Sequence, residues 1–191
     1  PYEQIAFQFS HHIYHEDGRI EHANEYINTT AGEFPNFEFI EHLQKALSKD
    51  EGTIFKFATH ENTILNAIRA QLKASDTPNK ESLVSFIESI SHPTRENPDQ
   101  WTVPTRKFNK GTRDMVDLCK VVIHYYYNPH TFGSNSIKKV LPAVLKSSQF
   151  VQDKYSKSIG TIGVSSKNLP KDHVWLKKLD NEIIDPYKSL P

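Results

Sequence analysis

A change in the spacing of apolar residues near Pro35 constrains the fold more than any other feature of the sequence. Between residues 5 and 15, apolar and more polar side chains alternate, which is the period of a strand with one buried face. Asp17-Gly18 follows and predicts a two-residue turn that returns the chain along residues 19–27. After Pro35, apolar residues recur every three or four positions, and this spacing predicts a helix.

The segments that follow complete an α/β pattern. Residues 53–58 are rich in β-branched and aromatic side chains, as a short buried strand requires, and an amphipathic helix comes next. Thr77-Pro78 predicts the start of another helix, and residues 114–118 predict a second strand that leads into a further helix. We expect an α/β fold in which both strands join the N-terminal antiparallel hairpin in one mixed sheet flanked by helices.

The second half of the chain gives weaker signals. Residues 91–112 carry three prolines and predict a long exposed loop. A helix from Ser136 is expected to bend or end at Leu141, because Pro142 has no backbone N–H to donate. Beyond Ser147 the periodicity fades, and no element is predicted there.

Composition limits the class of protein. A chain of 191 residues with 37% hydrophobic and 24% charged residues predicts one folded domain over residues 1–191. No apolar run approaches the roughly 18 residues of a membrane span, so we expect no membrane partner. The single cysteine, Cys119, excludes an intramolecular disulfide. With no targeting signal, we expect a cytoplasmic protein. The start at Pro1 indicates a piece of a longer chain, whose other domains are expected partners.

The zero net charge conceals a separation of charges along the chain. Residues 1–100 hold 8 basic and 16 acidic side chains, whereas residues 101–178 hold 14 basic and 4 acidic ones. Such asymmetry favours a nucleic-acid partner, DNA or RNA, that binds to the basic, loop-rich segment 101–178. The alternative is that the two halves of one fold attract each other.

Glu61 is the first candidate for chemistry. It lies in the segment Thr59-His60-Glu61-Asn62, where the strand at 53–58 ends and a helix begins. Ligands bind outside the carboxyl ends of strands in open α/β sheets, and a carboxylate there can hold Mg²⁺ or Mn²⁺. The alternative is a structural acid that complements the helix dipole.

Asp117 is the second candidate, because the end of the strand at 114–118 would bring it to the same crevice as Glu61. Asp114 is equally explained as a helix cap. The close histidines His11, His12 and His15 do not share one strand face, and a polar sheet surface explains them better than a metal site does.

A basic region provides the candidate nucleic-acid contacts. Ser134 and Ser136 precede a predicted helix whose first turn carries Lys138 and Lys139, an arrangement that suits a docked anion. Ordinary capping by Ser136 is the alternative. The candidate surface is completed by four upstream residues, Arg106, Lys107, Lys110 and Arg113.

Several strings together resemble a bacterial family known only as a domain of unknown function. The strings are Pro-Tyr-Glu-Gln-Ile-Ala-Phe-Gln-Phe-Ser (1–10), Ala-Thr-His-Glu-Asn-Thr-Ile-Leu (58–65), Met-Val-Asp-Leu (115–118), Tyr-Tyr-Tyr (125–127), Gly-Ser-Asn-Ser-Ile-Lys-Lys-Val-Leu-Pro (133–142) and Asp-Pro-Tyr-Lys (185–188). That family in turn resembles the ribonuclease H-like 3′–5′ exonucleases, whose active sites use four acidic residues.

The resemblance implies the middle portion of a two-metal phosphodiester hydrolase, truncated at both ends and using Mg²⁺ or Mn²⁺. Glu61 matches the acid of the second exonuclease motif, where Asp is usual, and is the expected metal ligand. Asp117 matches an acid on the next strand. The family's Asp-x-Glu pair would precede Pro1 and its last acid would follow Pro191, so we expect the chain alone to be inactive.

We therefore expect a fragment of a metal-dependent exonuclease-like domain. The second hypothesis is a non-catalytic nucleic-acid-binding or scaffolding module on the same fold. A third is an unrelated small-molecule enzyme that uses Glu61 and the histidines. The acids that flank this segment would separate the first two hypotheses, and a deep apolar pocket would favour the third.

Overall fold

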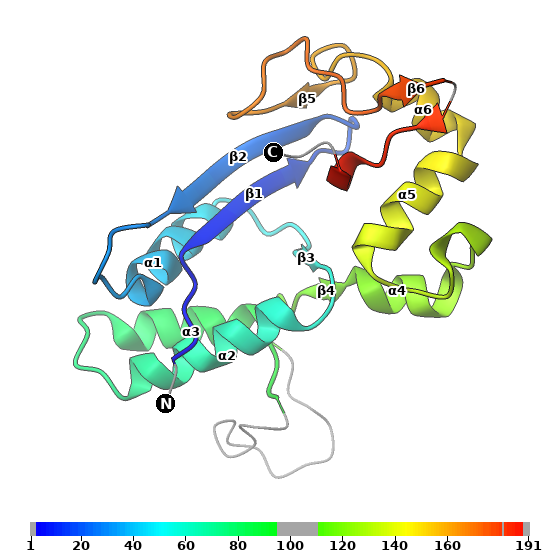
Figure 1. The fold of residues 1–191 in the computed structure, drawn as a ribbon. Coiled ribbons are helices and arrows are strands. Elements are labelled where there is room, and N and C mark those ends of the chain that lie inside the picture. The colour runs from blue at the N-terminus through cyan, green and yellow to red at the C-terminus, as the bar shows by residue number, and fades with distance from the viewer. Residues whose placement is uncertain (1–2, 95–110, 181, 189–191) are drawn as a thin grey trace. The chain divides into compact units, whose positions relative to one another are not determined.

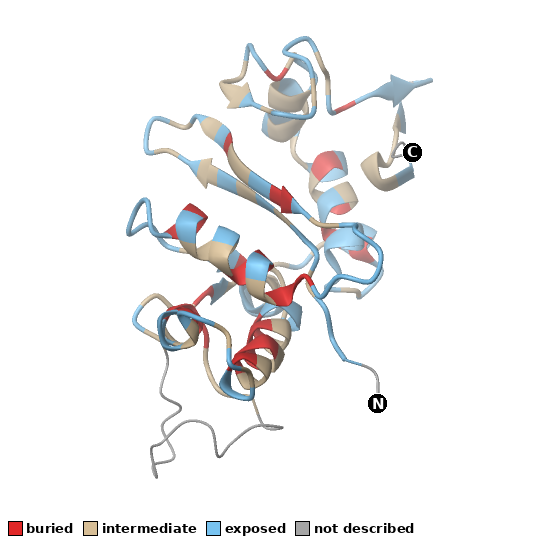
Figure 2. Cartoon of the chain, turned by 90° about the vertical axis from the view of Figure 1, so that its left-hand side faces the viewer, coloured by how far each residue is buried: buried red, intermediate tan, exposed pale blue. Residues whose placement is uncertain are grey.

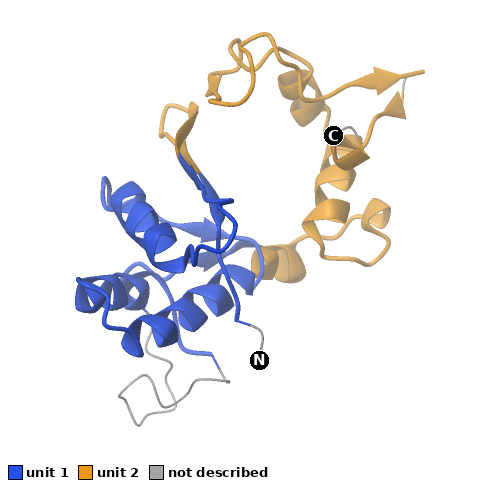
Figure 3. Cartoon of the chain, turned by 60° about the vertical axis from the view of Figure 1, so that its left-hand side comes forward, with its two compact units in different colours: residues 1–10, 25–118 blue, residues 11–24, 119–191 orange. Residues whose placement is uncertain are grey.

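The computed structural model of the protein describes residues 3–94, 111–180 and 182–188. The chain divides into two compact units (Figure 3). Unit 1 comprises residues 1–10 and 25–118, and unit 2 comprises residues 11–24 and 119–191. The predicted α/β class is confirmed, because helices alternate with short strands that pair both in parallel and as an antiparallel hairpin. No helix in the described ranges is both long and apolar enough to cross a membrane.

The N-terminal hairpin forms as predicted. Its strands are β1 (Gln8–Tyr14) and β2 (Ile20–Ile27), which are neighbours in one sheet (Figure 1). The turn is longer than the expected two-residue loop, because the His15 N–H bonds to the Arg19 carbonyl at 2.9 Å and leaves three residues between them. Of these three, only Gly18 takes a positive φ, 85°. The carboxylate of Asp17 accepts from the Arg19 N–H at 3.0 Å instead.

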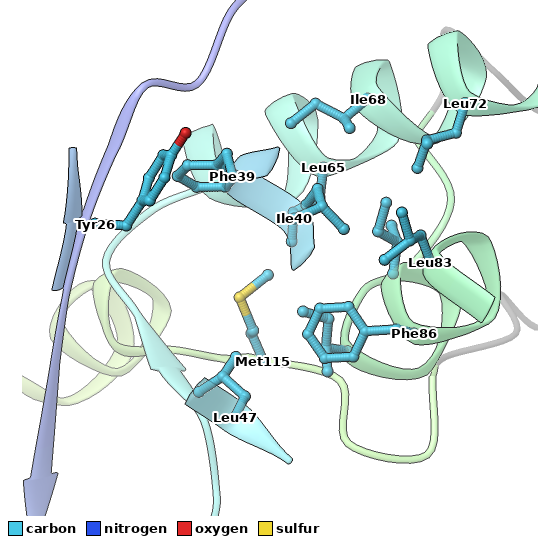
Figure 4. Packing of buried hydrophobic residues seen from close by; sticks show 12 residues of the cluster. Tyr26, Phe39, Ile40, Leu47, Leu65, Ile68, Leu72, Leu83, Phe86 and Met115 are labelled. Atoms are coloured by element: carbon cyan, nitrogen blue, oxygen red, sulfur yellow. The ribbon is translucent and has the colours of Figure 1, made fainter. Parts of the chain in front are cut away.

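Unit 1 is built on three helices around one apolar core. They are α1 (Asn36–Leu47), α2 (His60–Lys73) and α3 (Lys80–Ile90). Their buried positions are spaced by three and four residues, so each helix turns one face inward (Figure 2). The core cluster, most of which Figure 4 labels, consists of Tyr26, Phe39, Ile40, Leu47, Leu65, Ile68, Leu72, Leu83, Phe86, Ile87, Ile90 and Met115.

The helix α3 begins later than Thr77-Pro78, where the sequence predicts its start. Asn79 precedes the helix with a left-handed backbone, φ 63°, and the helix begins at Lys80. Asn tolerates this conformation better than most residues do, which explains how the chain turns sharply into α3. Most of the loop predicted at 91–112 lies outside the described residues.

Both short strands predicted in unit 1 form, but they are shorter than expected. β3 (Phe55–Lys56) and β4 (Val116–Asp117) pair in parallel, with Phe55 opposite Val116 and Lys56 opposite Asp117. Within the described residues they make a separate sheet, so the expectation of one sheet shared with the hairpin is wrong. The free edge of β2 pairs instead with β5 (Val164–Ser165). Strands of two residues have no alternating pattern from which a partner could be predicted.

Unit 2 contains α4 (Leu118–Tyr125, whose first residue belongs to unit 1), the short 3-10 helix η2 (Pro129–Thr131), α5 (Ile137–Ser147) and α6 (Gln149–Tyr155). The strands β6 (Lys178–Leu179) and β7 (Glu182–Ile183) and the turn η3 (Pro186–Lys188) follow.

The helix α5 continues through Pro142, although an end or bend at Leu141 was expected. Proline removes one hydrogen bond, to the carbonyl of Lys138, which is an exposed residue near the helix start. Burial of Val140, Ala143 and Leu145 on one face favours continuation of the helix.

Candidate functional site

The turn between β3 and α2 is the most constrained backbone near the predicted acids. Ala58 adopts a left-handed conformation, φ 76°, which is unfavourable for a residue with a Cβ. Its backbone N–H donates to Oδ1 of Asp117 at 2.9 Å. Asp117 ends β4, so the parallel pairing of β3 and β4 brings its side chain to the turn. Asp117 therefore lies at the turn that leads into α2, and the expectation that it faces the same crevice as Glu61 stays a prediction.

Glu61 lies in the first turn of α2 and is exposed. Its carboxylate forms no hydrogen bond or ion pair with any described residue. The Thr59 side chain does not cap the helix either. Glu61 thus combines favourable placement at the positive end of the helix dipole with a carboxylate that is open to a ligand.

Lys56 is a residue that the sequence argument missed. It lies opposite Asp117 in the β3–β4 register, yet only 5% of it is exposed. Most of its surface is therefore covered, which is unusual for a lysine. Its position as a lysine within the apolar run 53–58 could have identified Lys56 from the sequence.

A polar network joins α2 to the end of α3 and the start of β4. Nδ1 of His92 bonds to Oδ1 of Asp114 at 2.7 Å, so Asp114 is a hydrogen-bond partner of His92 and not the helix cap considered from sequence. The backbone of His92 exchanges two hydrogen bonds of 3.0 Å with the amide of buried Asn62. Asn66 donates to the carbonyl of His92 at 3.0 Å as well. This network holds the polypeptide that leads into β4.

The described residues do not by themselves fit a metal centre. No group of three or more His, Cys, Asp or Glu side chains converges within the described ranges. Oδ1 of Asp117 already accepts a hydrogen bond from the protein backbone, whereas the Glu61 carboxylate has no partner among the described residues. A pair of divalent cations needs several oxygen ligands, so further acids would have to be supplied.

The predicted histidine cluster forms side-chain pairs in unit 2. The rings of His12 and His22 stack with centroids 4.5 Å apart. Loss of hydration lowers the pKa of His12, and the charges of His22 and His11 lower it further. Nδ1 of His22 accepts from the Lys167 N–H at 3.2 Å. These contacts support a packed, polar sheet surface, as expected from the sequence.

The basic residues predicted to contact nucleic acid lie in different parts of the chain. Arg113 in unit 1 donates to the carbonyls of Leu47 at 2.7 Å and Gly52 at 2.8 Å, and it pairs with Asp50 at 3.3 Å. These bonds hold the C-terminal end of α1, and a nucleic-acid contact by Arg113 stays a prediction. The other three upstream cations, Arg106, Lys107 and Lys110, lie outside the described residues.

The start of α5 in unit 2 presents the remaining candidates. Lys138 and Lys139 are exposed in the first turn and form no ion pair with a described residue. Ser136 precedes the helix without making a side-chain capping bond, and Oγ of Ser134 accepts from the Ser136 N–H at 3.3 Å. Two lysines here oppose the helix dipole, so an anion would relieve their repulsion.

Comparisons with known proteins bear on the chain as a whole. No curated protein and no solved structure matched it. Residues 1–136 match a family model, and this match includes the turn at Ala58, Glu61 and Asp117 but not the first turn of α5. Because the match covers most of the sequence, the chain belongs to the family described as Domain of unknown function (DUF2779).

Proposed function

We propose that this chain is part of a metal-dependent, ribonuclease H-like nucleic-acid hydrolase of the 3′–5′ exonuclease type. The observation that carries the proposal is the presentation of Glu61. An exposed carboxylate without a described partner follows a strained strand-to-helix turn, and a second acid, Asp117, stabilises that turn. Strained backbone that side chains hold in place is characteristic of functional sites.

The two acids have different roles in this proposal. Glu61 is the ligand for Mg²⁺ or Mn²⁺, because its oxygens are open. Asp117 is a positioning residue, because Oδ1 bonds to the Ala58 N–H. The cations would neutralise phosphate charge and activate a water in a complete centre. The further acids are expected in the segments that the family resemblance places ahead of Pro1 and beyond Pro191.

The test compares this chain with the longest natural protein that contains it. Labelled single- and double-stranded DNA and RNA are incubated with each in Mg²⁺ and in Mn²⁺. We expect no hydrolysis by the 191-residue chain, because one open carboxylate cannot hold two cations. We expect hydrolysis by the longer protein and its loss in Glu61→Gln.

Glu81→Gln is the matched control. Glu81 is also an exposed acid in the first turn of a helix, α3, so both substitutions remove the same favourable interaction with a helix dipole. Activity should survive Glu81→Gln. Cleavage by the short chain, or cleavage that persists in Glu61→Gln, would contradict the assigned role.

The second candidate is a non-catalytic nucleic-acid-binding or scaffolding module. The observation that favours it is that no described cluster of three metal-ligating side chains exists. It predicts nucleic-acid binding in EDTA by the longer protein, together with no metal-dependent cleavage. The same assay therefore separates the two functions.

A further inference from the structure

Three aromatic rings are almost fully exposed within one short stretch of unit 2. Tyr125 ends α4, Tyr127 lies two residues later, and Phe132 directly follows η2. Their exposed fractions are 85%, 89% and 85%. Large rings on a soluble protein are normally covered over much of their surface. None of the residues of α4, all of which are described, is buried.

The backbone at Phe132 adds an independent observation. Phe132 has a left-handed conformation, φ 53°, and the next residue, Gly133, has φ 77°. Asn or Gly is the usual residue at such a position, and a bulky side chain there is a genuine outlier. The ring gains little packing in return, because it is exposed. Strain of this kind is expected where a side chain serves binding.

The stretch of chain that carries these rings has charges of one sign. Residues 118–152 contain four lysines and no Asp or Glu. The turn η2 packs against α5, and Nδ2 of Asn128 donates to Oγ of Ser147 at 2.9 Å. The segment from Asn128 to Thr131, which lies between Tyr127 and Phe132, therefore packs on α5, the helix whose first turn carries Lys138 and Lys139. A ligand for it should combine flat apolar faces with negative charge.

We propose that Tyr125, Tyr127 and Phe132 stack on the bases of a single-stranded nucleic acid, while Lys138 and Lys139 contact its phosphates. The inference rests on the proposed function, since it takes nucleic acid as the ligand. Single strands expose both faces of their bases and carry a charged backbone, whereas a duplex hides those faces. A symmetric contact with a second copy of this chain would bring the same lysines together, so like charges disfavour it.

The experiment measures binding of the chain to labelled oligo(dT) and to a duplex of equal length, by fluorescence anisotropy over a salt series in EDTA. EDTA removes any contribution from cations at Glu61. The aromatic variants are Tyr125→Ala, Tyr127→Ala and Phe132→Asn. Asn accepts the left-handed backbone, so Phe132→Asn removes the ring without adding strain. Tyr14→Ala is the matched control, because Tyr14 is 71% exposed and lies on β1.

Stacking and phosphate contact predict different signatures. Each aromatic variant should weaken oligo(dT) binding about fivefold or more and leave the log–log salt slope unchanged. The double variant Lys138→Gln/Lys139→Gln should flatten the slope by about 1.4 units, because each lost phosphate contact to a single strand removes about 0.7. Duplex binding should respond to the lysine variant alone. Tyr14→Ala should change nothing.

Three outcomes would overturn the inference. If the lysine variant alone affects oligo(dT), stacking is wrong, whereas nucleic-acid binding is supported and the proposed function is not contradicted. If the chain binds neither oligonucleotide at low salt, both the inference and the binding that it assumes fail. If the aromatic variants convert a dimer to a monomer in sedimentation without changing oligo(dT) affinity, the surface covers a second copy. Circular dichroism and thermal unfolding of Phe132→Asn exclude loss of folding as the cause.

Discussion

Oδ1 of Asp117 accepts a hydrogen bond from the backbone N–H of Ala58, with 2.9 Å between the two atoms. Fifty-nine positions separate them in the sequence, and the parallel pairing of β3 with β4 brings them together. The bond stabilises a left-handed residue that directly precedes the cap of α2. Asp117 thereby anchors the turn that leads to Glu61 in the first turn of α2.

Asp117→Ala should lower the free energy of unfolding by about 1–2 kcal/mol, because the Ala58 N–H loses its partner. Asp117→Asn should cost much less, because the amide oxygen can still accept this bond. Urea unfolding followed by circular dichroism measures both. Equal losses in the two variants would show that the charge of Asp117 matters and not the bond.

Ala58→Gly should raise the free energy of unfolding by about 0.5–1 kcal/mol. Removing the Cβ relieves the left-handed backbone, and the greater freedom of glycine in the unfolded chain offsets part of the gain. Thermal unfolding measures the change. Ala67→Gly, within α2, is the control and should be destabilising, since glycine weakens a regular helix. A loss of stability in Ala58→Gly would contradict the strain assigned to Ala58.

Glu88→Gln should destabilise unit 1 by about 2 kcal/mol. The guanidinium of Arg69 is 1% exposed and pairs with Glu88, so the variant removes a negative charge that directly faces a buried cation. Lys73→Gln is the control, because Lys73 is half-exposed and its Nζ lies 3.6 Å from the same carboxylate. It should cost less than about 0.5 kcal/mol. Similar costs in the two variants would contradict the role of burial.

Acidification should destabilise unit 2 through His12. The pKa of His12 in the folded protein lies below its ordinary value of 6.5, because partial burial removes water from the ring and the charges of His22 and His11 lower the pKa further. As the pH falls below 6.5, the unfolded chain takes up the proton first, so stability is lost down to the folded pKa. His12→Gln should flatten this part of the pH profile in thermal unfolding. A profile that stays unchanged would contradict the lowered pKa.

Tyr26 should ionise only at strongly alkaline pH. Burial, followed by its hydrogen bond of 2.6 Å to Glu38, raises the pKa of Tyr26 from 10.0 to about 12. The unfolded chain loses the proton first, so stability is full below pH 10 and declines as the pH rises through about 12. Absorbance titration at alkaline pH should show one late tyrosine that is missing in Tyr26→Phe. A titration in which no tyrosine of the wild type ionises late would contradict the raised pKa of Tyr26.

Local patterns in the sequence were sufficient for the elements with a clear period. Alternation near residues 5–15 predicted β1, and three-and-four spacing predicted α1 and α2, because a single buried face imposes that spacing. The position of Glu61 at the start of a helix after a strand was also predictable, and the structure has it there.

Tertiary contacts decided what no local pattern encodes. β2 pairs with Val164–Ser165 and not with β3. A two-residue strand has no alternating pattern of its own, so packing between segments far apart in the sequence sets its pairing. The burial of Lys56 and the hydrogen bond between Ala58 and Asp117 depend on which strands pair. The sequence by itself determined the α/β elements and the acid that heads α2, since these follow from residues near in the chain. Only the tertiary structure showed that Asp117 serves the turn, because hydrogen bonding depends on atoms being adjacent in space.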